Sequence, residues 1–183
     1  MAVWLVRAGS AGEYEDKFIS ESRVYVTWDL LDVNLGDFNQ REQVLAELAQ
    51  RYPDAKPKTL VNWSSQIWPF AQRMQAGDLI VMPLKTQPVV YIGELVSGYQ
   101  FESEGPEPFF HWRGVRWIGE AIPRSNFSQD LLYSFGAFMT ICRIQRNNAE
   151  ARIRSMAING WQPETLQQLV MDVATASDEV AVE

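Results

Sequence analysis

Apolar and polar residues follow a clear strand pattern in residues 77–99, the stretch around which the rest of the chain is organised. Two runs rich in β-branched residues, Leu79–Met82 and Val89–Leu95, are separated by the polar and turn-forming Lys85–Pro88. Such a pair predicts a β-hairpin rather than a helix. Gly93 lies inside the second run, which indicates a bulge, a barrel bend or a close approach of another backbone.

Further apolar runs with strand-like patterns lie at Ala2–Ala8, Val24–Trp28, Phe109–Ile118 and Phe138–Ile144. Apolar residues at helical spacing predict helices at Glu13–Ser22, Gln40–Arg51, Thr59–Gln75, Leu131–Phe138 and Glu150–Ile158. Pro69 kinks or divides the third of these helices. Five or six short strands interrupted by helices predict an α+β fold with a small curled barrel.

The length and composition fit one sizeable core, because the chain has 183 residues of which 46% are hydrophobic. We expect one domain over residues 1–160 and an acidic linker or tail over 161–183, with a helix-like segment at Leu166–Val173. No apolar run reaches the length of about 18 residues that a membrane-spanning helix needs. The N-terminus lacks the basic region of a signal peptide, so we expect a cytoplasmic protein.

The net charge of −7 argues against broad electrostatic binding of nucleic acid, but the charge is unevenly distributed. The last 21 residues carry five acidic residues and no Lys or Arg, whereas residues 111–162 hold seven arginines against three acidic residues. A local basic face is therefore compatible with the sequence. The seven Trp, six Tyr and nine Phe exceed what a core of this size needs.

Several segments together resemble a known family. They are the opening WLVRAG, the pair Trp28-Asp29, the helix end FAQRMQAGD and the strand segment YIGELVSGY. In this order they are similar to the EVE branch of the PUA-like superfamily, which is related to YTH and SRA domains. The closest likeness is to the N-terminal modules of Mrr-type modification-dependent restriction endonucleases. The resemblance covers Ala2–Ile144, and the insert Asn39–Lys58 departs from the compact members of the family.

The resemblance implies a PUA-like curled barrel that holds one modified base, flipped out of modified DNA, between aromatic side chains. Aromatic stacking can replace the stacking that a flipped base loses. The residues expected at this base pocket are Trp28 and Tyr99 as walls, Trp68 as a third wall, Asp29 and Ser64 as readers of polar base edges, and Trp63. For Trp63 a core role stays open, because it shares a helix face with Ile67.

Basic and polar side chains near the predicted pocket are candidates for contacts with the phosphate backbone. They are Arg7, Lys85, Arg113, Arg73 and His111. Solvent exposure or a surface salt bridge is the alternative for the four cations, and edge or backbone hydrogen bonding is the alternative for His111. A metal role for His111 is not expected, because the chain has one His and one Cys. Cys142 fits a packed thiol.

We expect no catalytic residues and no cofactor, because none of the nuclease, hydrolase, phosphate-loop or zinc-protease motifs is complete. By the resemblance, a nuclease domain is expected further along a full-length chain, in a restriction system that defends against phage. Three alternatives remain open: a reader of methylated RNA or single-stranded nucleic acid, a protein-interaction module, and an enzyme of ASCH-like type.

Overall fold

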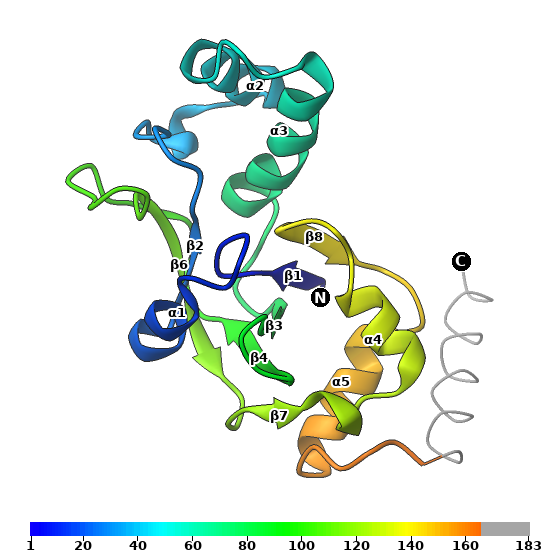
Figure 1. The fold of residues 1–183 in the computed structure, drawn as a ribbon. Helices are drawn as coiled ribbons and strands as arrows, with labels where there is room; N and C mark the ends of the chain where they lie inside the picture. Colours follow the sequence, from blue (N-terminus) through cyan, green and yellow to red (C-terminus); the bar gives the residue numbers. More distant parts are fainter. Residues whose placement is uncertain (166–183) are drawn as a thin grey trace.

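The computed structural model describes residues 1–165 (Figure 1). Its strands are β1 (Val3–Val6), β2 (Arg23–Val26), β3 (Leu79–Pro83), β4 (Val89–Leu95), β5 (Gln100–Phe101), β6 (His111–Trp117), β7 (Ile122–Pro123) and β8 (Ile141–Ile144). Its helices are α1 (Glu15–Glu21), α2 (Arg41–Arg51), α3 (Pro57–Gln72), α4 (Gln129–Phe135) and α5 (Ala149–Ile158), with 3-10 turns η1 (Leu35–Asp37) and η2 (Arg124–Asn126). The prediction of a mixed α+β fold is confirmed.

The strands form one curled sheet in the spatial order β2-β6-β4-β3-β1-β8, and the short β5 and β7 pair with β6 and β4. The predicted hairpin is confirmed, because β3 and β4 pair antiparallel with Ile80 opposite Gly93. Strand β1 runs parallel to β3, with Val3 opposite Leu79, and antiparallel to β8. Within residues 1–165, β2 and β8 end the strand order without pairing to each other, so the sheet is a half-barrel.

The central strands are buried on both faces. In β1, Trp4 and Val6 belong to a core shared with α1, α2 and α3, whereas Val3 and Leu5 belong to a core shared with α4 and α5. Figure 1 shows these two groups of helices on different sides of the central strands. A strand covered on both faces reads as a continuous apolar run, which explains the pattern of Leu79–Met82.

The Gly77-Asp78 pair joins the starts of β1 and β3. The carboxylate of Asp78, a residue that is 4% exposed, accepts hydrogen bonds from the Ala2 amide, the Trp4 indole and the Gln75 amide, each at 3.0 Å. Gly77 adopts φ 95°, a conformation that favours glycine. Gly77-Asp78, the last two residues of the FAQRMQAGD segment, thus lie where the parallel pairing of β1 and β3 begins.

Several predicted elements differ from those in the structure, and one of the differences affects the candidate site. Strand β2 ends at Val26, opposite His111 at the start of β6, so Trp28 lies beyond the paired strand. Helix α3 is one continuous helix that contains Pro69, whereas the sequence left a division open. Helix α4 ends at Phe135 rather than at residue 138, and the last strand begins only at Ile141.

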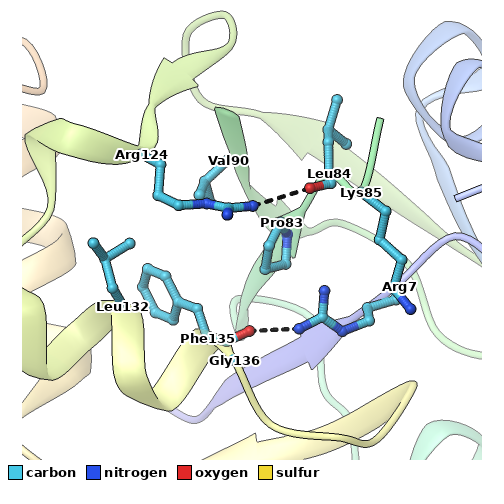
Figure 2. Close-up of a pocket in the computed structure, with 9 residues that line it drawn as sticks. All are labelled: Arg7, Pro83, Leu84, Lys85, Val90, Arg124, Leu132, Phe135 and Gly136. Carbon is cyan, nitrogen blue, oxygen red and sulfur yellow. Dashed lines mark hydrogen bonds between the residues drawn. The ribbon is translucent and has the colours of Figure 1, made fainter. Parts of the chain in front are cut away.

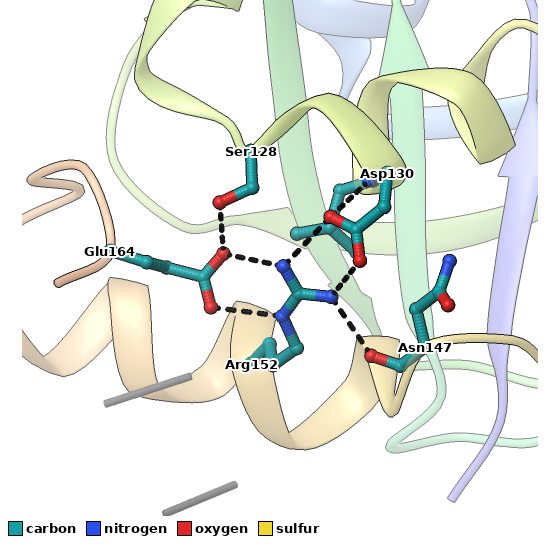
Figure 3. Close-up of polar contacts among 6 residues, drawn as sticks. Ser128, Asp130, Asn147, Arg152 and Glu164 are labelled. Atoms are coloured by element: carbon teal, nitrogen blue, oxygen red, sulfur yellow. Dashed lines mark hydrogen bonds and ion pairs between the residues drawn. The ribbon is translucent and has the colours of Figure 1, made fainter. Parts of the chain in front are cut away.

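An ionic cluster holds residue 164 on the helical side of the domain (Figure 3). The Arg152 side chain, 4% exposed, donates to Asp130 at 2.6 and 2.9 Å and to Glu164 at 2.9 Å. It also donates to the Asn147 carbonyl at 3.0 Å, and the Ser128 hydroxyl donates to Glu164 at 2.8 Å. The hydrogen bonds from Arg152 hold the pKa of Asp130 below its usual value.

The first residues of the predicted tail are therefore packed on the domain. The indole of Trp161 donates to the Ile118 carbonyl at 3.2 Å, close to the Glu164 cluster in sequence. The predicted helix-like segment Leu166–Val173 lies outside the described residues. No helix within residues 1–165 has the length and apolar character required to cross a membrane.

Gly93 provides a test of the curled sheet, because a Cβ there would lie 2.5 Å from Val115 Cγ2 and 2.9 Å from the Trp117 ring. We expect Gly93→Ala to lower the free energy of unfolding by roughly 1–3 kcal/mol, measured by urea denaturation. Gly98→Ala is the control, since a Cβ there meets no atom within 4 Å. Equal stability of the two variants would contradict the close approach.

Candidate functional site

A cavity of about 350 Å³ lies at the ends of β1 and β2, against α2 and α3. The chain that leaves β1 turns at Gly9 and Gly12, which have φ of 89° and 76°, and so brings its next residues beside those that follow β2. Ten residues line the cavity: Gly9, Ser10, Glu13, Tyr14, Thr27, Trp28, Asp29, Tyr52, Trp63 and Thr140. Small-molecule sites occupy about 300–1,000 Å³, so the cavity is large enough for a ligand group.

Four of the lining side chains are aromatic and come from four different parts of the chain. Tyr52 follows α2 and meets Trp63 of α3 edge to face, with ring centroids 5.0 Å apart and an angle of 68°. Tyr14 packs against Phe109 in the same manner at 4.9 Å. Trp28 forms no ring pair with another aromatic side chain in the described part of the chain. Its ring is half-buried, packs against the hydrophobic core and lines the cavity.

The cavity is electronegative. Glu13 and Asp29 line it, and both residues are exposed. Burial raises the pKa of Tyr14, and the charges of Glu13 and Asp29 raise it further. Burial also raises the pKa of Tyr52, and the negative charge of Asp29 raises it further. Both phenols stay protonated, and the cavity favours ligands that donate hydrogen bonds or carry positive charge.

The loop that follows Trp28 is held on the domain by hydrogen bonds to its backbone. The Tyr52 hydroxyl donates to the Asp29 carbonyl, and the Leu30 amide donates to Glu107 at 2.6 Å. Arg51 donates to the Leu30 carbonyl at 2.5 Å. Leu30 adopts φ 67°, which is uncommon for a residue with a side chain. These contacts keep the cavity wall in place without using the Trp28 ring or the Asp29 carboxylate.

Further along the same loop, the backbone of Leu31 and Leu35 is bonded to Tyr99, which follows β4, and to His111 at the start of β6; we call this chain of hydrogen bonds the relay. The Leu35 amide donates to the Tyr99 hydroxyl at 3.1 Å, and that hydroxyl lies 2.6 Å from His111 Nδ1. His111 Nε2 lies 2.5 Å from the Leu31 carbonyl, an acceptor, so Nε2 carries the proton and Nδ1 accepts from Tyr99. Burial lowers the pKa of His111 to about 4, which keeps the ring neutral near pH 7.

The predicted pairing of Trp28 with Tyr99 as two walls is not formed. Trp28 lines the cavity, whereas Tyr99 does not, because its hydroxyl is bound to the 31–35 loop and its ring stacks on His111. The other aromatic side chains that line the cavity with Trp28 are Tyr14, Tyr52 and Trp63.

Of the three α3 residues predicted at the pocket, one lines the cavity. Trp63 does so, and Trp68 is half-buried against the core, outside the cavity lining. Ser64 is 1% exposed, and its hydroxyl donates to the Val61 carbonyl at 2.8 Å and accepts from Arg41 at 3.3 Å. A side chain so enclosed cannot read a base edge, so the prediction for Ser64 is wrong.

Two of the predicted phosphate contacts are also wrong, because their side chains are buried. His111 is 0% exposed and serves the relay above. Arg113 is 3% exposed and donates to the Phe70 and Ala71 carbonyls at 2.6 and 3.2 Å, in the last turn of α3. Burial lowers the pKa of Arg113 to about 10. A cation at a helix C-terminus complements the helix dipole, so Arg113 has a structural role.

The other three cations remain accessible. Arg7 and Lys85 line a separate cavity beside the aromatic one, shown in Figure 2. Arg73 is exposed and lines a different cavity, together with Trp4 and Asp78. Two of the five residues predicted as phosphate contacts, Arg7 and Lys85, thus line one cavity.

Tyr14 and Tyr52 were missed as site residues. Tyr14 shares helical spacing with Phe18 and was assigned to a helix, but α1 starts after it, at Glu15. Tyr52 directly follows α2 in a segment that the resemblance treats as an insert. The one signal in the sequence was the excess of aromatic residues, which does not say which of them share a cavity.

Comparison with known families gives one match, to the family described as "Domain of unknown function (DUF8426)", over residues 4–140. The chain belongs to this family. All ten residues of the aromatic cavity fall within the matched range of the DUF8426 domain. No curated protein and no solved structure matches the chain. In the part of the chain that the structure describes, no cluster of His, Cys, Asp and Glu could hold a metal ion.

The relay predicts a pH dependence of stability. The pKa of His111 is about 4 in the folded protein and about 6.5 when unfolded, so its contribution is complete above pH 6.5 and is lost as the pH falls through 4. The full loss is roughly 3 kcal/mol. We expect NMR titration of this histidine, the sole one in the chain, to give the low pKa. Titration near pH 6.5 in the folded protein would contradict the relay.

Proposed function

We propose that this DUF8426 domain binds a modified nucleobase, taken out of its stack in DNA, in the aromatic cavity. The observation that carries the proposal is that four aromatic side chains and two carboxylates line one cavity of about 350 Å³. Aromatic rings supply the stacking that a flipped base loses, worth about 1–3 kcal/mol per base. A methyl group on the base adds apolar contact of roughly 0.8 kcal/mol, or about fourfold in affinity.

The carboxylates restrict which bases the cavity favours. Asp29 and Glu13 carry acceptor oxygens only, when ionised, and so pair with N–H donors on a base edge. Cytosine, adenine and guanine carry an exocyclic amine, whereas thymine and uracil present carbonyl oxygens beside their ring N–H. Among the amine-bearing bases we propose methylated or hydroxymethylated cytosine and methylated adenine as the ligands, in line with the resemblance of the sequence to readers of modified bases.

The wider role follows from the resemblance of the sequence to base-reading modules. We propose that the domain is a binding module without catalysis of its own, and that it directs a modification-dependent restriction system to modified DNA. In such a system a nuclease domain in the full-length chain would cut the DNA. Methylated RNA and single-stranded nucleic acid present the same flipped bases at lower unstacking cost, so they are tested beside duplex DNA.

A second candidate function is favoured by the charge of the cavity. Aromatic rings with nearby carboxylates also bind quaternary ammonium groups, such as that of trimethyl-lysine in a peptide. Burial is the first cause of the raised pKa values of Tyr14 and Tyr52. The negative charges of Glu13 and Asp29 for Tyr14, and of Asp29 for Tyr52, raise them further, and these charges would stabilise such a cation. In this case the domain would be a protein-interaction module.

Removal of the Trp28 ring tests the base-binding cavity. We expect Trp28→Ala to weaken binding of the preferred modified oligonucleotide by about tenfold or more, and Trp28→Phe to retain most of the affinity, because a ring is kept. The measurement is fluorescence anisotropy on a panel of otherwise identical oligonucleotides with 5-methylcytosine, 5-hydroxymethylcytosine, N6-methyladenine or no modification. Each is offered as single strand and duplex, and as DNA and RNA.

The matched control is Tyr133→Ala, which removes an aromatic side chain that is 84% exposed on α4 and lies outside the cavity. Its affinity should equal that of the unmodified protein. Thermal unfolding checks that the Trp28 variants are folded. Unchanged affinity in a folded Trp28→Ala variant would reject the aromatic cavity as the base site.

Asp29→Asn tests the polar reading of the base. It keeps the side-chain shape but replaces an acceptor oxygen with an N–H donor, so binding of a base with an exocyclic amine should weaken by about tenfold. Asp37→Asn is the control, an exposed acid in η1 that does not line the cavity. A trimethyl-lysine peptide is titrated in parallel. Saturable binding of the peptide and of no oligonucleotide would favour the second function over the first.

A further inference from the structure

A second cavity, of about 330 Å³, lies between the end of β1, the β3–β4 turn and the end of α4 (Figure 2). Its wall is partly apolar, formed by Pro83, Leu84, Val90, Leu132, Phe135 and Gly136. The other lining residues are the cations Arg7, Lys85 and Arg124, and none of these forms an ion pair within residues 1–165.

Neutral carbonyl groups hold these cations in place. Arg7 Nη2 donates to the Phe135 carbonyl at 2.6 Å, and Arg124 Nη2 donates to the Leu84 carbonyl at 3.1 Å. Lys85 Nζ donates to the Ser10 carbonyl. Figure 2 shows the two guanidinium groups on either side of Pro83. Carbonyl partners orient a cation without neutralising it, and a guanidinium with one nitrogen engaged keeps further N–H donors.

The charge balance of this cavity is positive. Burial lowers the pKa of Arg7, and the neighbouring charge of Arg124 acts in the same direction. Glu15, a residue that is 4% exposed, opposes this, and it accepts from the Lys85 amide at 2.7 Å and the Thr86 hydroxyl at 2.5 Å. With one carboxylate and three cations, the cavity has an excess of two positive charges. An anion with two negative charges would balance this excess.

We propose that the cavity of Arg7, Lys85 and Arg124 binds a phosphate group. Donors that converge from three segments suit a tetrahedral oxyanion, whereas a planar carboxylate is matched by one guanidinium fork. The apolar side of the cavity, with Pro83 and Phe135, accommodates the carbon atoms of a phosphate ester.

The position of the cavity connects it to the proposed base site. Ser10 lines the aromatic cavity, and its carbonyl accepts the hydrogen bond of Lys85, which lines the cationic one. The phosphate can therefore come from the nucleic-acid strand whose base enters the aromatic cavity, or from a free phosphate compound. The strand as source rests on the proposed function, whereas phosphate binding itself does not.

The first experiment titrates the full chain with inorganic phosphate and with pyrophosphate, at constant ionic strength set with sodium chloride, and follows backbone amide NMR signals. We expect saturable shifts at Lys85, Arg124 and Gly136. Arg124→Gln should weaken this binding by about tenfold, because it removes a charge-assisted hydrogen bond. Arg124 is exposed, so this variant should keep the fold.

Arg116→Gln is the control, since it removes an equal charge from a side chain that is 61% exposed and paired with Glu94 on the sheet. Its phosphate binding should be unchanged. If Arg7 and Arg124 only cap carbonyl groups, Arg124→Gln will lower the melting temperature and leave the phosphate response as it was. That result, or shifts no larger than those with chloride, would overturn the proposal.

The second experiment identifies the source of the phosphate. It compares a short oligonucleotide carrying the preferred modified base with the free modified nucleoside. If the phosphate belongs to the strand, Arg124→Gln should weaken binding of the oligonucleotide about tenfold and leave the affinity for the nucleoside unchanged. If the ligand is a free phosphate compound, Arg124→Gln should lose pyrophosphate binding and retain its affinity for the oligonucleotide. If Trp28→Ala changes the affinity for none of these ligands while Arg124→Gln abolishes phosphate binding, the base proposal is rejected and the phosphate site is supported.

Discussion

The buried carboxylate of Asp78 is the interaction on which the fold depends most. It joins the Ala2 amide and the Trp4 indole of the first strand to the Gln75 amide at the end of the α3 segment. A buried charge is costly unless its hydrogen bonds are made, and here three donors at 3.0 Å meet that need. Because β1 and β3 are parallel, no hairpin turn sets their register, and this carboxylate does so instead.

The pairing of β1 with β3 determines where the loops of the domain emerge. Residues Gly9–Tyr14, which follow β1, lie at the same end of the sheet as Thr27–Asp29, which follow β2. The sheet is a half-barrel, so the helices α2 and α3 can approach this end and contribute Tyr52 and Trp63. The aromatic cavity is thus made by loops and helix ends on a rigid scaffold, as is common for binding sites.

The two cavities have opposite electrostatic character, although Lys85 of the cationic cavity donates to the carbonyl of Ser10, which lines the aromatic one. One is lined by Glu13 and Asp29 with aromatic rings, and the other by Arg7, Lys85 and Arg124. The net charge of −7 therefore gives little information on ligand chemistry, because local fields within a few ångströms decide which groups bind. A nucleotide whose base carries an exocyclic amine complements this arrangement, because its N–H donors suit the acidic cavity and its negative phosphate suits the cationic one.

The sequence by itself determined the elements with strong local signals. Alternating and continuous apolar runs located the hairpin, and Gly93 indicated a special position in its second strand. The neighbours that restrict Gly93 are the side chains of Val115 and Trp117 rather than another backbone. It also pointed to Trp28, Asp29 and Trp63, which line one cavity, and to Arg7 and Lys85, which line the other. Only the tertiary structure decided that Tyr14 and Tyr52 join the first set and Arg124 the second. It also decided that His111, Arg113 and Ser64 are buried. The reason is physical: local periodicity reports which face of an element is apolar, whereas the grouping of side chains from distant segments depends on strand register and helix packing.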